Sequence, residues 1–125
     1  MMKLVLIAIG GAVGSVARYG TGTLLMRAME RTLFPWGTLA VNLIGCLLIG
    51  YLNALLDDRL IRPEYRFLLV VGFLGGYTTF SSFGWETMAL LRAGQHTRAA
   101  FYILANNIIG VLLVMVGYAL SRLHR

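Results

Sequence analysis

Residues 72–83 read GFLGGYTTFSSF, and the interpretation of the whole chain depends on this stretch. It lies inside a long apolar segment, Phe67–Leu91. Three glycines followed by two threonines and two serines form a poor helix by intrinsic propensity. Two interpretations are open. Either the helix breaks here, which is tolerated at bilayer depth only where the backbone is buried in protein or lines a polar cavity, or it continues and its hydroxyl groups bond to the preceding turn.

Three more apolar segments surround this one, Leu4–Met26, Trp36–Leu56 and Ala99–Leu120. Each is close to or above the roughly 20 residues that cross a hydrocarbon core about 30 Å thick. The chain has 125 residues, of which 58% are hydrophobic and 13% charged, so almost none remain to give a soluble bundle its polar face. The first segment is too long for a signal peptide and is interpreted as a retained span. The sequence therefore predicts one all-α domain, residues 1–125, of four transmembrane helices.

The basic residues, which give a net charge of +6, flank the apolar segments and so indicate contact with anionic lipid headgroups rather than with nucleic acid. The side with both termini and the second loop carries six cations, and the other side carries four, or five if Arg18 is counted. The two sets are Lys3, Arg59, Arg62, Arg66, Arg122 and Arg125 against Arg27, Arg31, Arg92 and Arg98. This weak asymmetry leaves two topologies open, a single orientation with the termini inside or dual insertion with antiparallel pairing. Four short helices do not easily enclose a pore, so a two-fold dimer is expected.

Phe80 and Phe83 are three residues apart and share one helix face. Such a pair usually packs in a core or faces lipid. Here Thr79, Ser82 and Glu86 occupy neighbouring faces of the same helix. Because an aromatic ring has a positive edge, two rings can line a path for a small anion without binding it too tightly to let it go.

Amide side chains lie inside two other apolar segments. Asn42 follows Thr38 by one turn in the second, and Asn106 and Asn107 follow Tyr102 in the fourth. Amides in hydrocarbon are costly unless paired, so they face protein or water. Either they form hydrogen bonds between helices, or they replace water around a passing anion.

Arg18 comes four residues after Gly14 and is predicted to lie on the packed face of the first helix. It either anchors that helix at the interface or makes a vestibule attractive to anions. No Cys, His and carboxylate cluster has metal-ligand spacing, and no nucleophile is paired with a base, so an enzyme is not expected.

At these residues the chain resembles the Fluc/CrcB family of fluoride channels, nearly from end to end. The motifs that carry the resemblance are Gly10-Gly11, Gly14, Arg18-Tyr19, Gly37-Thr38, Asn42, Gly45 and, above all, the run from Gly75 to Phe83. The resemblance implies an antiparallel, dual-topology homodimer in the cell (inner) membrane, with two pores that passively export toxic cytoplasmic fluoride.

The resemblance also implies roles for single residues. Phe80 and Phe83 correspond to the phenylalanines whose ring edges meet fluoride, and Asn42 to a pore-lining amide. Polar lining is expected from Thr79 and Ser82. The carbonyl groups of Gly75 and Thr78, from both subunits, are expected to hold a structural sodium ion at the dimer centre, consistent with the preference of hard cations for oxygen.

On the fourth helix the family has a polar track that often includes hydroxyl groups. Tyr102 and Asn106 are its nearest equivalents here, and Gly110 leaves a gap in it. The alternative to a fluoride channel is a small multidrug transporter, also four helices and dimeric. That class needs an acidic residue in its first span to exchange protons for cations, and Leu4–Met26 has none.

Overall fold

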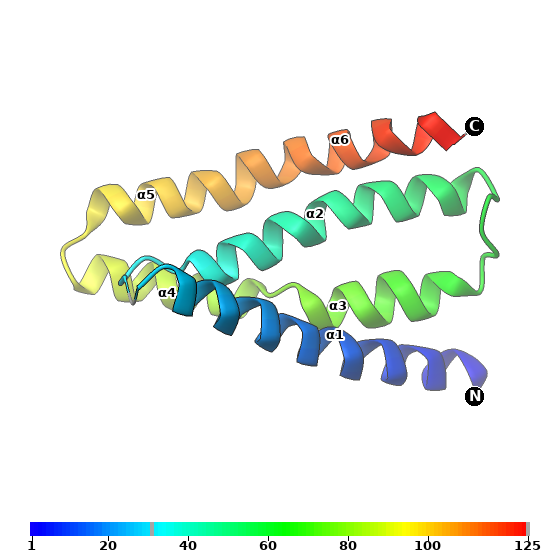
Figure 1. Cartoon of the computed structure of the whole chain (residues 1–125), viewed down its shortest axis with the longest axis horizontal. Helices are drawn as coiled ribbons and strands as arrows, with labels where there is room; N and C mark the ends of the chain where they lie inside the picture. Colours follow the sequence, from blue (N-terminus) through cyan, green and yellow to red (C-terminus); the bar gives the residue numbers. More distant parts are fainter. Residues whose placement is uncertain (31, 125) are drawn as a thin grey trace.

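The computed structural model describes residues 1–30 and 32–124, and all regular structure in these ranges is helical. Arg31 and Arg125, two of the cations counted above, lie outside the described residues. Four long helical runs lie side by side, and both termini are at the same end of the molecule (Figure 1). The first two runs are α1 (Met2–Ala28) and α2 (Trp36–Asp57). The third comprises η1 (Arg66–Leu74), α3 (Gly75–Tyr77) and α4 (Phe80–Arg92), and the fourth α5 (His96–Leu104), η2 (Ala105–Ile109), α6 (Gly110–Ser121) and η3 (Arg122–His124).

Within the described ranges, each run is long and apolar enough to cross a membrane. The predicted all-helical, four-span architecture is thus confirmed. The helices extend beyond the predicted apolar segments, most clearly in the fourth run, which covers His96–His124 where hydropathy indicated Ala99–Leu120. Hydropathy falls at the edge of the hydrocarbon, whereas helical hydrogen bonding continues into the headgroup region.

Glycines allow α1 to pack closely against the first half of the third run. A Cβ atom added to Gly10 would collide with the carbonyl oxygen of Leu68, and one added to Gly14 with that of Phe73. From the opposite side, a Cβ on Gly76 would lie 2.5 Å from the carbonyl oxygen of Gly11. Small residues at such contacts bring two backbones together, which is how membrane helices gain van der Waals energy without a hydrophobic driving force.

A second close pair is formed by α2 and α6, which lie side by side in Figure 1. A Cβ atom on Gly50 would collide with the carbonyl oxygen of Val114, and one on Gly117 with that of Leu47. The bundle is therefore built from two tight helix pairs, α1 with η1 and α3, and α2 with α6.

The segment before α2 is attached to the fourth run by aromatic contacts. Pro35 precedes the first residue of α2, where its missing N–H is not needed. Phe34, which is 5% exposed, packs its ring 4.5 Å from Trp36, 5.7 Å from Phe101 and, edge-on, 5.6 Å from Tyr102 (centroid distances). This contact fixes the start of α2, and with it the direction in which Asn42 projects.

At the other end of α2, Arg66 ties the start of η1 to the last turns of α2. Its guanidinium donates to Asn53 Oδ1 at 2.8 Å and to Asp57 Oδ1 at 3.1 Å. The Arg66–Asp57 pair is exposed, so its contribution to stability is small.

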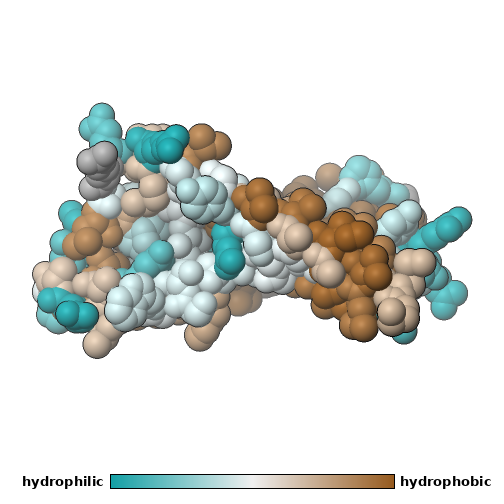
Figure 2. Space-filling view, turned by 90° about the horizontal axis from the view of Figure 1, so that it is seen from below, coloured by the Kyte–Doolittle hydropathy of each residue, from teal (hydrophilic) through white to brown (hydrophobic). Residues whose placement is uncertain are grey.

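Much of the outer surface is apolar. Large hydrophobic side chains such as Val16 (72% exposed) and Leu24 (68%) project outward from α1. Figure 2 shows hydrophobic residues gathered toward the end with the termini and hydrophilic residues at both extremes of the molecule. Such a surface is typical of a protein whose outer faces contact lipid or another protein.

Candidate functional site

The third helical run is interrupted at Thr78 and Thr79, between α3 and α4. Both residues have extended backbones, with φ/ψ of −84°/158° and −150°/123°. The hydroxyl of Thr78 donates to the carbonyl of Leu74 at 2.9 Å. A hydroxyl bonded to the preceding turn was expected for a continuous helix. Here the same bond occurs directly before the interruption. The hydroxyl oxygen of Thr79 caps the new helix by accepting from the N–H of Ser82 at 3.2 Å.

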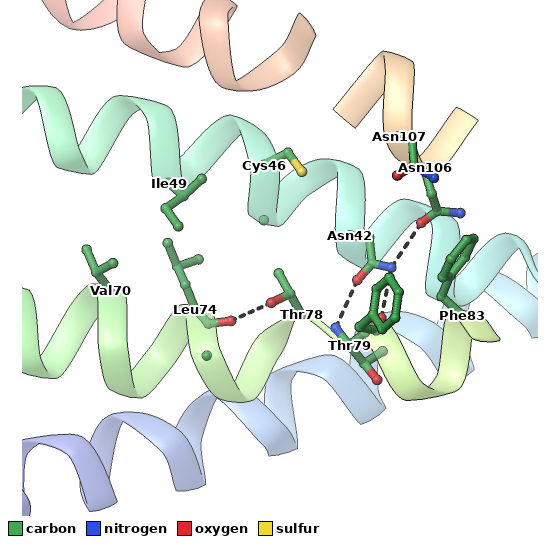
Figure 3. A pocket seen from close by; sticks show the side chains of 13 residues that line it. Asn42, Cys46, Ile49, Val70, Leu74, Thr78, Thr79, Phe83, Asn106 and Asn107 are labelled. Atoms are coloured by element: carbon green, nitrogen blue, oxygen red, sulfur yellow. Dashed lines mark hydrogen bonds between the residues drawn. The ribbon is translucent and has the colours of Figure 1, made fainter. Parts of the chain in front are cut away.

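Asn42 of α2 forms hydrogen bonds to both backbone polar groups of the extended residue Thr79. Its Oδ1 accepts from the N–H of Thr79 at 2.9 Å, and its Nδ2 donates to the carbonyl of Thr79 at 3.1 Å (Figure 3). A buried backbone group left unpaired costs about 1–3 kcal/mol. This pair of bonds, the Asn42 clasp, therefore takes the place of the missing helical turn.

The clasp is linked to the fourth run. Asn42 Nδ2 also donates to Asn106 Oδ1 at 3.0 Å, as drawn in Figure 3, and Asn106 Nδ2 donates to the carbonyl of Tyr102 at 2.9 Å. Asn106 lies in η2, a π-helical turn between the α-helices α5 and α6. Wider turns of this kind occur frequently at functional sites. Hydrogen bonds thus join three helical runs at one level of the bundle.

The rings of Phe80 and Phe83 contact each other, with centroids 5.5 Å apart and planes inclined by 49°. Their surroundings differ sharply. Phe83 is 9% exposed and packs 5.3 Å from the ring of Tyr102, whereas Phe80 is 81% exposed. One chain therefore holds one ring in place and leaves the other projecting from its surface.

A cavity of about 350 Å³ lies beside the interruption. It brings together seven of the predicted site residues: Asn42, Gly75, Thr78, Thr79, Phe80, Phe83 and Asn106. Asn107 lines it as well, and Figure 3 shows the residues from α2, the third run and η2 gathered around this space.

Three predicted residues lie elsewhere. Ser82 and Arg18 line a neighbouring cavity of about 310 Å³, which shares Thr79 with the first. Tyr102 is completely buried, between Phe83 and Phe34. Arg18 also lines a third, larger cavity of about 890 Å³. The first two cavities thus meet at Thr79, and Arg18 connects the second with the third.

Glu86 takes part in a network that we did not predict from the sequence. Its two carboxylate oxygens accept from Thr38 Oγ1 at 2.8 Å and from the Tyr102 hydroxyl at 2.6 Å. Glu86 and Thr38 line the 890 Å³ cavity together with Arg18. The available signal was the spacing of Glu86 four residues after Ser82, which places both on one face of α4.

Tyr77, to which the sequence assigned no role, is 5% exposed and secures the short helix α3. Its hydroxyl donates to Thr21 Oγ1 of α1 at 3.3 Å, and its ring stacks on Phe73 with 5.6 Å between centroids. This anchor lies directly before the extended peptide.

Two carbonyl groups at the interruption lose the donors that a continuous helix would provide. The N–H of Thr79, which would bond to Gly75, donates to Asn42, and the N–H of Ser82, which would bond to Thr78, donates to the Thr79 side chain. Gly75 and Thr78 both line the 350 Å³ cavity. Among the described residues no group of three His, Cys, Asp or Glu side chains is placed to hold a metal. Carbonyl oxygens are ligands that suit a hard cation rather than a soft transition metal.

Residues 5–118 match the protein family described as CrcB-like protein, Camphor Resistance (CrcB). Similar curated proteins cover almost the whole chain. The chain is 47% identical to a protein of Agrobacterium fabrum, with 98% of both chains covered, and 43% identical to one of Methylobacillus flagellatus, with 98% and 97% covered. It is 42% identical to a protein of Thermus thermophilus, with 97% and 96% covered. All three are named fluoride-specific ion channel FluC.

Proposed function

The chain belongs to the CrcB-like family, and from this premise we propose that it is a fluoride-selective channel that conducts passively. It is a multi-pass membrane protein and not an enzyme. The observation that carries the proposal is the cavity in which the paired rings of Phe80 and Phe83 adjoin Asn42 and Asn106. The proton-coupled cation transporter gains no support, since the relatives are named fluoride channels and α1 contains no acidic residue.

In this proposal a fluoride ion loses part of its hydration shell at the interruption, and weakly interacting protein groups replace the lost water molecules. Amide N–H groups and the positive edges of the two rings stabilise the anion without a full positive charge. Such a site binds an ion firmly enough to dehydrate it and weakly enough to release it. Thr79, Ser82 and Asn106 provide the polar side of this path, Asn42 lines it and holds the extended peptide in place, and Arg18 attracts anions to its mouth.

The pathway needs a second copy of the chain. Phe80 is 81% exposed, and the cavity beside it opens to the outer surface of the single chain. A two-fold partner that covers this face would bring a second pair of rings and close the path. We infer an antiparallel dimer with two pores, because the weak asymmetry of basic residues allows either orientation.

A sodium ion at the centre of that dimer is part of the proposal. Gly75 and Thr78 of one chain would supply two carbonyl oxygens and the second copy two more. The ion would neutralise the converging carbonyl dipoles, while the Asn42 clasp and the Tyr77 hydroxyl bond hold the peptide that presents them.

The proposed cellular role is export of cytoplasmic fluoride across the inner membrane, which lowers its toxicity. Purified protein in liposomes loaded with fluoride or chloride tests the activity. We expect rapid fluoride efflux and retention of chloride. Equal leakage of the two ions, or none of either, would refute the proposed selectivity.

The dual orientation has its own test. A reporter fused to the C-terminus is expected on both sides of the membrane in intact cells. A reporter found on one side alone would rule out the antiparallel dimer.

A further inference from the structure

Asn107 is an exposed amide in the middle of an apolar helical run. It lies in η2, and its neighbours Leu104, Ile108 and Val111 are 54%, 55% and 62% exposed. A carboxamide that faces hydrocarbon is costly unless it meets protein or water. Its own chain supplies one partner, the carbonyl of Ile103, so the rest of the amide still calls for a polar partner.

The side chain of Asn107 lines the 350 Å³ cavity beside the interruption, together with Asn42, Phe80 and Asn106. Figure 3 shows Asn106 and Asn107 next to each other at the edge of this space. Two consecutive residues of a regular α-helix diverge by about 100°, and the wider π turn reduces this angle. In η2 both amides reach one cavity.

The hydrogen bonds of the three asparagines show which donors remain for an anion. Each amide group has two N–H donors. Those of Asn42 are both engaged, by Asn106 Oδ1 and by the carbonyl of Thr79. Asn106 uses one, for the carbonyl of Tyr102, and Asn107 uses one, for the carbonyl of Ile103 at 2.8 Å.

Within the described structure, the donors left in this cavity by the three amides are thus one N–H of Asn106 and one of Asn107. We propose that Asn107 is a further anion-contacting residue, which donates its second N–H to fluoride while Asn42 acts as the scaffold. This inference rests on the proposed function, because it assumes that fluoride passes through the cavity. The competing role for Asn107 is a hydrogen bond to a second copy of the chain.

Current through single channels in planar bilayers, recorded over a range of fluoride concentrations, tests the inference. Asn107→Leu keeps the size of the side chain but removes its donors. We expect the half-saturating fluoride concentration to rise about tenfold or more, since a hydrogen bond to a charged group contributes roughly a tenfold to hundredfold factor in binding. Asn107→Gln, which retains an amide, is expected to show a smaller rise. If the leucine variant does not fold, Asn107→Ala replaces it, since alanine favours the helix and adds no bulk.

A matched control moves the amide by one position. The double variant Asn107→Leu with Ile108→Asn has the amide on the neighbouring exposed site and should behave like Asn107→Leu alone. A leucine variant with the wild-type half-saturating concentration would overturn the inference. So would a leucine variant that elutes as a monomer while the wild type elutes as a dimer, because Asn107 would then act in assembly. A wild-type protein that passes no fluoride would overturn the proposed function itself, and this inference with it.

Discussion

Replacing Asn42 by leucine removes three hydrogen bonds at once while leaving the volume of the side chain nearly unchanged. Two of them form the clasp on Thr79, and the third reaches Asn106. Hydrogen bonds between membrane helices contribute about 0.6 kcal/mol on average and about 1.7 kcal/mol at most, so three contribute roughly 2–5 kcal/mol. Thr79 lines two cavities, where water can reach its freed N–H and carbonyl. We therefore expect a loss in the lower half of that range, about 2–3 kcal/mol.

The loss can be measured by reversible unfolding of the purified protein in mixed micelles, followed by circular dichroism. Fluoride flux into liposomes, measured on the same preparations, is expected to fall sharply because the extended peptide is no longer held. Asn42→Asp keeps the acceptor for the Thr79 N–H but sets its second oxygen against two acceptors, the Thr79 carbonyl and Asn106 Oδ1, so it should recover little of the lost stability. Its charge repels anions from the cavity and should also reduce flux.

Asn53→Leu is a matched control in the same helix. Asn53 pairs with Arg66 at the end of α2, remote from the interruption, and its loss should cost no more than about 1 kcal/mol and leave flux intact. If Asn42→Leu changes the free energy of unfolding by less than about 0.5 kcal/mol, the clasp does not hold the interruption and the reasoning fails.

Three further predictions follow from other contacts. Phe80→Ile should reduce fluoride flux while the dimer stays intact in gel filtration, because the exposed ring contributes its edge to the path rather than to packing; unchanged flux would exclude it from the pathway. Tyr102→Phe removes the 2.6 Å bond to Glu86 and should lower flux by leaving one oxygen of this carboxylate without its donor beside the 890 Å³ cavity, an effect that Glu86→Gln should relieve in the double variant. Gly117→Ala should destabilise the fold by about 1–3 kcal/mol because the new methyl group meets the backbone of α2. Gly20→Ala, where nothing lies within 4 Å, should not, and equal melting temperatures for the two would contradict the close contact between α2 and α6.

The four helices could be predicted because the hydropathy and length of a segment depend only on residues that are close in the sequence. The same is true of the three-residue spacing that places Phe80 and Phe83 on one face. Gly10 and Gly14 of α1 pack against the helix that carries Gly72 and Gly76, and the four-residue spacing of each pair is typical of close contacts between membrane helices. Local propensity narrowed the interruption to a stretch of glycines, threonines and serines, but it left open whether the helix breaks.

The deciding interaction is not local. The N–H and carbonyl of Thr79 are satisfied by Asn42, which lies 37 positions away in the chain, and propensity contains no information about such a partner. The same is true of the bond from Thr38 to Glu86, whose sequence separation is 48. The π turn η2 was not foreseen either, because Ala105–Ile109 has no residue that marks it in the sequence. What the sequence could not provide was the register of one helix against another.

The extended peptide is held by groups of its own chain: Asn42 bonds to the N–H and the carbonyl of Thr79, Asn106 bonds to Asn42, and the N–H of Ser82 bonds to the Thr79 side chain. One chain is therefore enough to shape this hollow. In the proposed dimer, assembly would then join two finished halves without rewinding the peptide.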